Sequence, residues 1–292
     1  MKAQFDQNLL SSFYLWFENA LLKEDIKAYV TGLENSFKYV EYSDLPSDFI
    51  GYQGQFRQLV ADQSVESPNS GVYINGQFIN DDPDSNGGVF LDYQEGRVVL
   101  PLSSGKDLDI TATSTVKEVN TYIANDSDVS TILQSDFLEN GQTTPYFFNQ
   151  SEKLDEKTFF LPACFISLAS SKNDEHCIGG MEETKNRVQV MVLTRDNFVI
   201  DSIISKFRDS ARDEFSHIPY ENFPYGFSYS IKQAPYDYEV FQKTFEGGVT
   251  THLDKVSVSK VYSERMRELI NRDFSVAMME FDLSTYRFPR LQ

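Results

Sequence analysis

The sequence predicts an α+β protein with a β-rich N-terminal half, and three observations predict it. Apolar residues recur at helical spacing over residues 7–25, short apolar runs joined by tight turns fill residues 36–122, and a strand runs into a helix over residues 187–214. Together they indicate a leading helix, a β-sandwich or partial barrel, and a C-terminal mixed sheet that carries one main helix.

The leading helix carries a heavy aromatic stripe on one face. Its apolar residues at helical spacing are Leu9, Phe13, Trp16, Phe17, Ala20 and Leu21. A stripe of this kind packs either on its own domain or on a neighbouring protein.

Two hairpins define the β-rich half. Asn75-Gly76 lies between two apolar pairs and is a strong hairpin signal, because both central residues of that turn adopt positive φ. A second hairpin covers residues 89–100, with its turn at Gln94-Glu95-Gly96. Residues 52–60 and 108–122 predict further strands, and these closely spaced strands favour a sandwich or partial barrel.

The chain divides into residues 1–124, a polar linker or arm at 125–156 with a short helix at 127–138, and residues 157–292. In the last segment, Asp196 is a fitting N-cap for a helix with a stripe of Ile and Phe. The other elements expected there are strands at 159–169, 187–193, 254–262 and 273–285, the last with a bulge, and a short helix at 263–270.

The charge of the chain argues against nucleic-acid binding. There are 26 Lys and Arg against 44 Asp and Glu, a net charge of -18, and no dense basic run. DNA readout normally needs a basic face. Such a charge suits a protein that borders a DNA path without adhering to it, or it only maintains solubility. No apolar run approaches the ~20 residues that span a bilayer, and no signal-peptide pattern opens the chain.

No motif in the sequence names an enzyme, a metal or a cofactor. The two cysteines, Cys164 and Cys177, are too few for a disulfide framework and predict a reduced place of folding. The neighbourhood of residues 174–177, Asp-Glu-His-Cys, lacks the paired spacings of a zinc site. Nucleophile elbows and phosphate-binding loops are missing as well. We therefore expect a non-enzymatic protein.

One acidic loop resembles the start of a calcium-binding loop. Asp82, Asp84 and Asn86, followed by Gly87, match its opening spacing of alternate oxygen ligands. The twelfth position is Tyr93, where a bidentate Glu is required, and the flanks are expected to be strands. An acidic surface loop is the better interpretation.

Several stretches together resemble virion structural proteins of marine contractile-tailed bacteriophages. They are residues 92–100, 153–158, 159–165 and 281–289. The predicted strand and helix over 187–214 are also similar to the ring-forming core of phage tail terminators and neck proteins. The resemblance implies a neck protein in a head–tail connector or tail terminator ring around the DNA channel. It implies a homo-oligomeric ring, contacts with portal-side, neck or tail proteins, assembly in the host cytoplasm, and no membrane partner.

Ring subunits contact each other head to tail and use aromatic anchors. Each of the candidate anchors could equally belong to an ordinary core. The candidates are Trp16, Phe17, Phe223, Tyr225, Phe227, Tyr236 and Tyr238.

Two alternatives remain open at this point. The chain could be a baseplate or collar component of the tail, or a calcium-dependent carbohydrate-binding β-domain with Asp82 and Asp84 as its calcium ligands.

The calcium alternative gives the first testable prediction. Calcium added to EDTA-treated protein should leave its melting temperature unchanged in scanning calorimetry, because the acidic loop lacks the bidentate ligand. Magnesium at the same ionic strength is the control. A calcium-specific rise of several degrees would instead support the carbohydrate-binding alternative.

Overall fold

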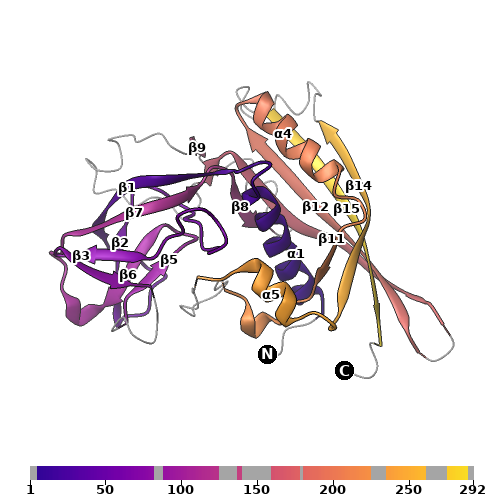
Figure 1. Cartoon of the computed structure of the whole chain (residues 1–292), viewed down its shortest axis with the longest axis horizontal. Helices are drawn as coiled ribbons and strands as arrows, with labels where there is room; N and C mark the ends of the chain where they lie inside the picture. Colours follow the sequence, from indigo (N-terminus) through magenta and orange to yellow (C-terminus); the bar gives the residue numbers. More distant parts are fainter. Residues whose placement is uncertain are drawn as a thin grey trace.

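A computed structural model of the chain describes residues 5–81, 88–124, 137–139, 159–177, 180–224, 235–260 and 275–288. It consists of two curled sheets with a long helix, α1 (Phe5–Leu22), between them (Figure 1). The predicted α+β class, rich in strands, is confirmed.

The N-terminal half forms one curled sheet of seven strands. Its long strand β1 pairs with β7 over its first part and with β2 over its last part, which joins the two halves of the sheet. A single curled sheet matches the partial-barrel alternative rather than two facing sheets. The strands in spatial order are β4 (Gln77–Asn80), β3 (Gly71–Ile74), β7 (Ile110–Lys117), β1 (Tyr29–Val40), β2 (Phe49–Gln53), β6 (Arg97–Pro101) and β5 (Phe90–Asp92).

Both predicted hairpins are present. Asn75 and Gly76 connect β3 to β4 with φ of 50° and 80°, the positive values that this two-residue turn requires. Gly96 has a φ of 62° in the turn between β5 and β6, and a Cβ there would lie 1.9 Å from the carbonyl oxygen of Phe56. Only glycine fits that position.

The second large sheet is mixed. β8 runs parallel to β11, and the remaining pairs are antiparallel. Beside this sheet, β9 (Phe137–Glu139) and β10 (Phe159–Leu161) form a short parallel pair. The six strands in spatial order are β13 (Glu214–Ser216), β14 (Thr250–Lys260), β15 (Ser275–Arg287), β12 (Glu182–Thr194), β11 (Ala163–Glu175) and β8 (Asn120–Ile123).

Two helices cover the same face of the six-stranded sheet. The rings of Phe17 in α1 and Phe207 in α4 (Asn197–Arg208) stack with centroids 4.0 Å apart, and Phe281 of β15 contacts both. Asp196 caps α4 as predicted, accepting a hydrogen bond from the Phe198 amide at 2.8 Å.

Shorter elements complete the described chain. They are α5 (Tyr238–Thr244) and the 3₁₀ turns η1 (Leu102–Ser104) and η3 (Tyr220–Asn222). Within the described ranges, no helix has the length and hydrophobicity to cross a bilayer.

The leading helix is buried on all sides, not only along its aromatic stripe. Every residue from Ser11 to Leu22 is buried, because β8, β11 and β13 of the six-stranded sheet cover one side, and α5, η3 and Lys117 of β7 cover the others. Two elements of the predicted N-terminal segment, α1 and β8, therefore contribute to the C-terminal sheet layer.

Several predicted strands differ in detail, and residues 159–169 form β10 and the start of β11, which belong to different sheets. Residues 108–122 form two strands, β7 and β8, which belong to different sheets. The strand predicted at 52–60 ends at Gln53. β15 pairs with β12 without a register shift, and the bulge lies in the neighbouring β14, between Leu253 and Lys255.

The predicted bulge in β15 came from a shift by one position in the alternation of its apolar residues. That shift arises because both faces of the sheet are buried there. Ala277 packs under the helices, whereas Val276 joins a small apolar cluster on the opposite face. The predicted helix at 263–270 and residues 127–136 of the other predicted helix lie outside the described residues, and residues 137–139 form β9.

The outer edge of β8 is bonded to a side chain instead of a strand. The Gln58 side chain donates to the Thr121 carbonyl and accepts from the Thr121 amide, both at 2.8 Å.

We predict that Gln58→Ala lowers the free energy of unfolding by about 2 kcal/mol, because the buried amide of Thr121 loses its partner and its carbonyl keeps only the Tyr14 hydroxyl, at 3.2 Å. Urea denaturation measures this. The matched control is Gln189→Ala, which removes a partly exposed hydrogen bond to Glu280 and should cost less than about 0.5 kcal/mol. An equal loss of unfolding free energy in the two variants would contradict the role of Gln58 as the hydrogen-bond partner of the β8 edge.

Candidate functional site

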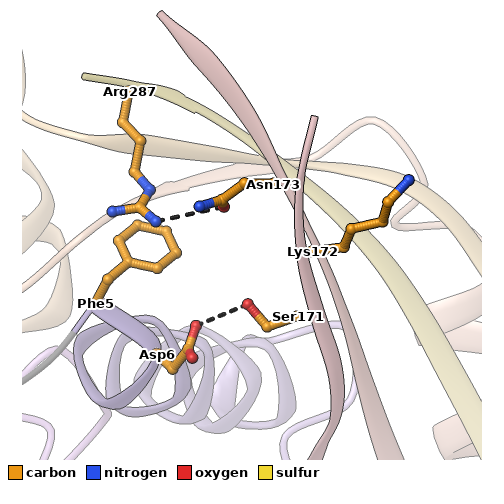
Figure 2. Close-up of a pocket in the computed structure, with 6 residues that line it drawn as sticks. All are labelled: Phe5, Asp6, Ser171, Lys172, Asn173 and Arg287. Carbon is orange, nitrogen blue, oxygen red and sulfur yellow. Dashed lines mark hydrogen bonds between the residues drawn. The ribbon is translucent and has the colours of Figure 1, made fainter. Parts of the chain in front are cut away.

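A polar pocket of about 280 Å³ lies where α1 begins, against the far ends of β11 and β15 (Figure 2). Its lining residues are Phe5, Asp6, Ser171, Lys172, Asn173 and Arg287.

Arg287 forms one wall of the pocket. Its guanidinium carbon lies 3.9 Å from the centroid of the Phe5 ring, a cation–π stack. Its Nε donates to Thr184 Oγ1 at 2.7 Å, and its Nη2 donates to Asn173 Oδ1 at 3.4 Å. These contacts fix the guanidinium between the start of the helix and the end of the sheet.

Asp6 forms the opposite wall. Its Oδ1 accepts from Ser171 Oγ at 3.1 Å and from Asn186 Nδ2 at 3.4 Å. Lys172 points away from Phe5 and Arg287 in Figure 2, and its amine pairs with Asp174 at 2.6 Å. The charges of the pocket are therefore one guanidinium and one carboxylate, each bonded to neighbouring strands.

His217 also packs against Phe5, with ring centroids 5.1 Å apart. Its Nε2 shares a 2.7 Å hydrogen bond with Thr251 Oγ1, which in turn contacts Thr285 Oγ1 at 2.6 Å. Burial, with a smaller contribution from Arg287, lowers the pKa of His217 to about 4. The imidazole is therefore neutral at pH 7.

These bonds do not form a catalytic triad. In a triad one histidine links the serine to the carboxylate. Here Ser171 bonds directly to Asp6, whereas His217 bonds to Thr251. The contacts instead join the start of α1 to strands β11, β12 and β15, so the pocket positions the helix against the sheet.

The metal-like neighbourhood at residues 174–177 is arranged as an ordinary strand end. Asp174 pairs with Lys172 and with Lys185, and His176 packs against Tyr286 with ring centroids 4.7 Å apart. Both thiols are free, Cys164 buried and Cys177 exposed. In the part of the chain that the structure describes, no three His, Cys, Asp or Glu side chains gather as a metal site would need.

A buried charged cluster lies deeper, between α1 and the seven-stranded sheet. Lys117 Nζ contacts Glu18 Oε1, both side chains 2% exposed, and Tyr236 donates to Glu18 Oε2 at 3.0 Å. Beside them, Asn19 donates to Asp62 Oδ2 at 3.2 Å. Burial raises the pKa of Asp62 and lowers that of Lys117, while the contact with Glu18 favours the charged amine.

The predicted interface residues that the structure describes are all core residues of this chain. At most 7% of each residue is exposed, because these rings fill the space between α1, α4 and residues 218–224 and 235–241. They are Trp16, Phe17, Phe223, Tyr236 and Tyr238. In this conformation they offer no contact surface to a partner.

The other candidates lie outside the described residues. They are Tyr225 and Phe227 among the interface residues, and Asp82, Asp84 and Asn86 of the acidic loop.

The pocket itself was not predicted. Arg287 lies in one of the stretches that carry the phage resemblance, but nothing in the sequence pairs it with Phe5. The contact joins two residues that are far apart along the chain, and a single sequence carries no local signal for it.

Comparison of the chain with protein-family models and with curated proteins gives no match.

His217 provides a test of this region. Its folded-state pKa lies below the usual 6.5, so unfolding takes up a proton between about pH 4 and 6.5. Its contribution to stability is complete above pH 6.5 and is lost as the pH falls toward 4. We predict that His217→Gln flattens the pH dependence of the unfolding free energy in this window by about 1–2 kcal/mol.

Denaturant titrations at several pH values measure this effect. Val240→Gln, at a non-titrating residue 54% exposed on α5, is the control and should keep the wild-type slope. An unchanged slope in His217→Gln would contradict the burial of a neutral imidazole.

Proposed function

We propose that the chain is a non-enzymatic structural protein of the neck of a tailed bacteriophage, a subunit of the head–tail connector or tail terminator ring around the DNA channel. Its partners would be further copies of itself and neighbouring portal-side, neck or tail proteins. The sequence resemblance motivates the proposal. The observation that carries it is a projecting arm of the six-stranded sheet.

The arm consists of residues 170–177, 182–187 and 284–288, the ends of β11, β12 and β15. Figure 1 shows the hairpin of β11 and β12 extending past both α1 and α4. β15 pairs with β12 along its whole length, out to Arg287 opposite Glu182. A three-stranded extension of this kind is held firmly at its base and is open to partners at its tip.

The tip of the arm combines exposed rings with alternating charge. Tyr286 is 42% exposed and Phe288 is 45% exposed. Lys185 lies 3.2 Å from Glu183 and 3.5 Å from Asp174. Aromatic side chains surrounded by charged groups are typical of the centre and rim of a protein interface. Contacts made by such an arm on a different surface of the next subunit are head to tail, which is how rings close.

The pocket on the face of the arm that contacts α1 supports the same function. Arg287 and Asp6 connect the arm to the start of α1, the helix around which both sheets pack. An arm anchored in this way keeps its direction relative to the body. A ring needs that property, because small angular errors at each contact prevent closure.

The net charge of -18 agrees with a place beside DNA. A channel surface of the same sign as the phosphates lets the duplex pass without releasing counterions and so without tight binding.

Electron microscopy of the purified chain, and of virions in which it is labelled, tests the proposal. Rings in the purified protein, or a label at the head–tail junction, are the expected results. A label at the distal tail would indicate a baseplate component instead, and a monomer with no label on virions would contradict the proposal.

The arm gives a sharper prediction. The double variant Tyr286→Ser with Phe288→Ser removes both exposed aromatic side chains. It should reduce the formation of oligomeric rings at least tenfold, because aromatic side chains at an interface contribute about 1–2 kcal/mol each. Ring yield on negatively stained grids measures it. Phe198→Ser, at an aromatic residue on α4 that is 82% exposed, is the matched control and should leave the oligomeric rings intact. Equal ring yields in both variants would exclude the arm as the contact.

A further inference from the structure

A buried lysine of the seven-stranded sheet meets a buried glutamate of α1, and neither belongs to the arm or to its pocket. Lys117 is the last residue of β7, and Glu18 lies in the second half of α1. Lys117 Nζ contacts Glu18 Oε1, and each side chain is only 2% exposed. An amine and a carboxyl group that are far apart along the chain therefore meet in its interior.

The surroundings of this contact are largely apolar. The residues three and four positions from Glu18 on α1 are all buried, and they are Tyr14, Leu15, Leu21 and Leu22. A charge costs far more free energy in such surroundings than in water, even when it is paired. Transfer of one proton from the ammonium to the carboxylate removes both charges and leaves a neutral amine beside a carboxylic acid. Burial favours this neutral pair, because it lowers the pKa of Lys117.

The backbone holds both groups in place. Lys117 pairs with Tyr29 of β1, and its amide donates to the Gln58 carbonyl at 3.0 Å. Glu18 lies in the part of α1 where every residue is buried. Two groups fixed against each other in this way react as if each were present at an effective concentration of about 10⁵ M or more.

A third group is bonded to the other carboxyl oxygen. The Tyr236 hydroxyl donates to Glu18 Oε2 at 3.0 Å, and Tyr236 is only 3% exposed. Its backbone is fixed as well, since its amide donates to the Ala61 carbonyl at 3.1 Å. A donor in this position stabilises the negative charge that develops on the oxygen when a nucleophile attacks the carboxyl carbon. The two oxygens therefore differ: Oε1 contacts the amine and Oε2 contacts the phenol.

We propose that Lys117 and Glu18 condense to an amide that joins β7 covalently to α1. The Nζ lone pair attacks Glu18 Cδ and forms the Nζ–Cδ bond, while the Tyr236 hydroxyl stabilises the oxyanion at Oε2. Two protons pass from Nζ to Oε1, the oxygen that it contacts. The Cδ–Oε1 bond breaks, Oε1 leaves as water, and Oε2 remains as the amide carbonyl. One ammonium and one carboxylate thus give one amide and one water, with no further reactant.

The amide suits this site better than the ion pair does. It carries no charge, so the cost of keeping two charges in the interior is removed. Its carbonyl oxygen keeps the hydrogen bond from Tyr236. The new bond also closes the chain between residues 18 and 117, and a cross-link of that span restricts the unfolded chain strongly. The inference concerns the chemistry of a single chain and does not rest on the proposed function.

Mass spectrometry of the denatured, full-length protein tests the proposal. The wild-type mass should lie below the mass calculated from the sequence by one water molecule. A tryptic digest should contain a branched peptide that joins residues 18 and 117, because trypsin does not cleave after an acylated lysine. A folded wild-type chain that keeps the full calculated mass after prolonged incubation, or a lost water that maps to other residues, would overturn the proposal.

Lys117→Arg is the matched variant for the mass measurement. It keeps the positive charge opposite Glu18, but a guanidinium is not deprotonated in proteins and so supplies no neutral amine. The variant should have its full calculated mass. A variant that still lacks one water molecule would show that the loss arises elsewhere and would overturn the proposal.

Tyr236→Phe tests the reaction itself, because it removes the hydroxyl and keeps the ring. It should slow cross-linking about a hundredfold, since the developing oxyanion loses a donor. The cross-linked fraction at successive times after a short pulse of synthesis measures the rate. Tyr238→Phe is the control, at a neighbouring buried tyrosine whose hydroxyl bonds to Gln242, and should keep the wild-type rate. Equal rates in the two variants would overturn the proposed role of Tyr236.

Discussion

The burial of α1 between the two sheets is the constraint on which the rest of the structure depends. One side of the helix supplies Phe13 and Phe17 to the apolar core under the six-stranded sheet. The other side places Glu18 against Lys117 of the seven-stranded sheet. A buried ion pair contributes little net stability compared with an apolar pair, but either charge left alone would be strongly destabilising. The pair therefore fixes which side of the helix faces which sheet.

Side-chain amides take the place of missing strands at several positions. Gln58 bonds to both backbone groups of Thr121. Asn69 does the same on Thr115, with both bonds at 2.8 Å. A carboxamide, like a peptide group, is planar and carries both an acceptor oxygen and a donor N–H. It can therefore replace one residue of a neighbouring strand. Strands that end between the two sheets keep their hydrogen bonds satisfied in this way, and the sheets can lie close to a helix without exposing backbone.

Local patterns predicted the local structure well. The Asn75-Gly76 turn, the Asp196 cap and the alternation in β12 all depend on residues close in sequence. The errors have a common origin in long-range packing. The aromatic stripe of α1 indicated one buried face, but the polar face is buried too, because Glu18 finds its partner about one hundred residues away. The pocket at Arg287 could not be predicted for the same reason, and neither could the membership of β8 in the second sheet.

The position of Phe281 has a consequence for how the protein is made. Its ring contacts Phe13 and Phe17, residues that leave the ribosome long before it does. Until β15 is synthesised, β8 and β11 can cover the aromatic side of α1 only in part, because β15 lies between β12 and β14 in the middle of the sheet. Contacts of such wide sequence separation make folding slow and leave apolar surface exposed to aggregation. The core must therefore close after most of the chain has been translated, and the nascent α1 is the segment that a chaperone would have most reason to bind.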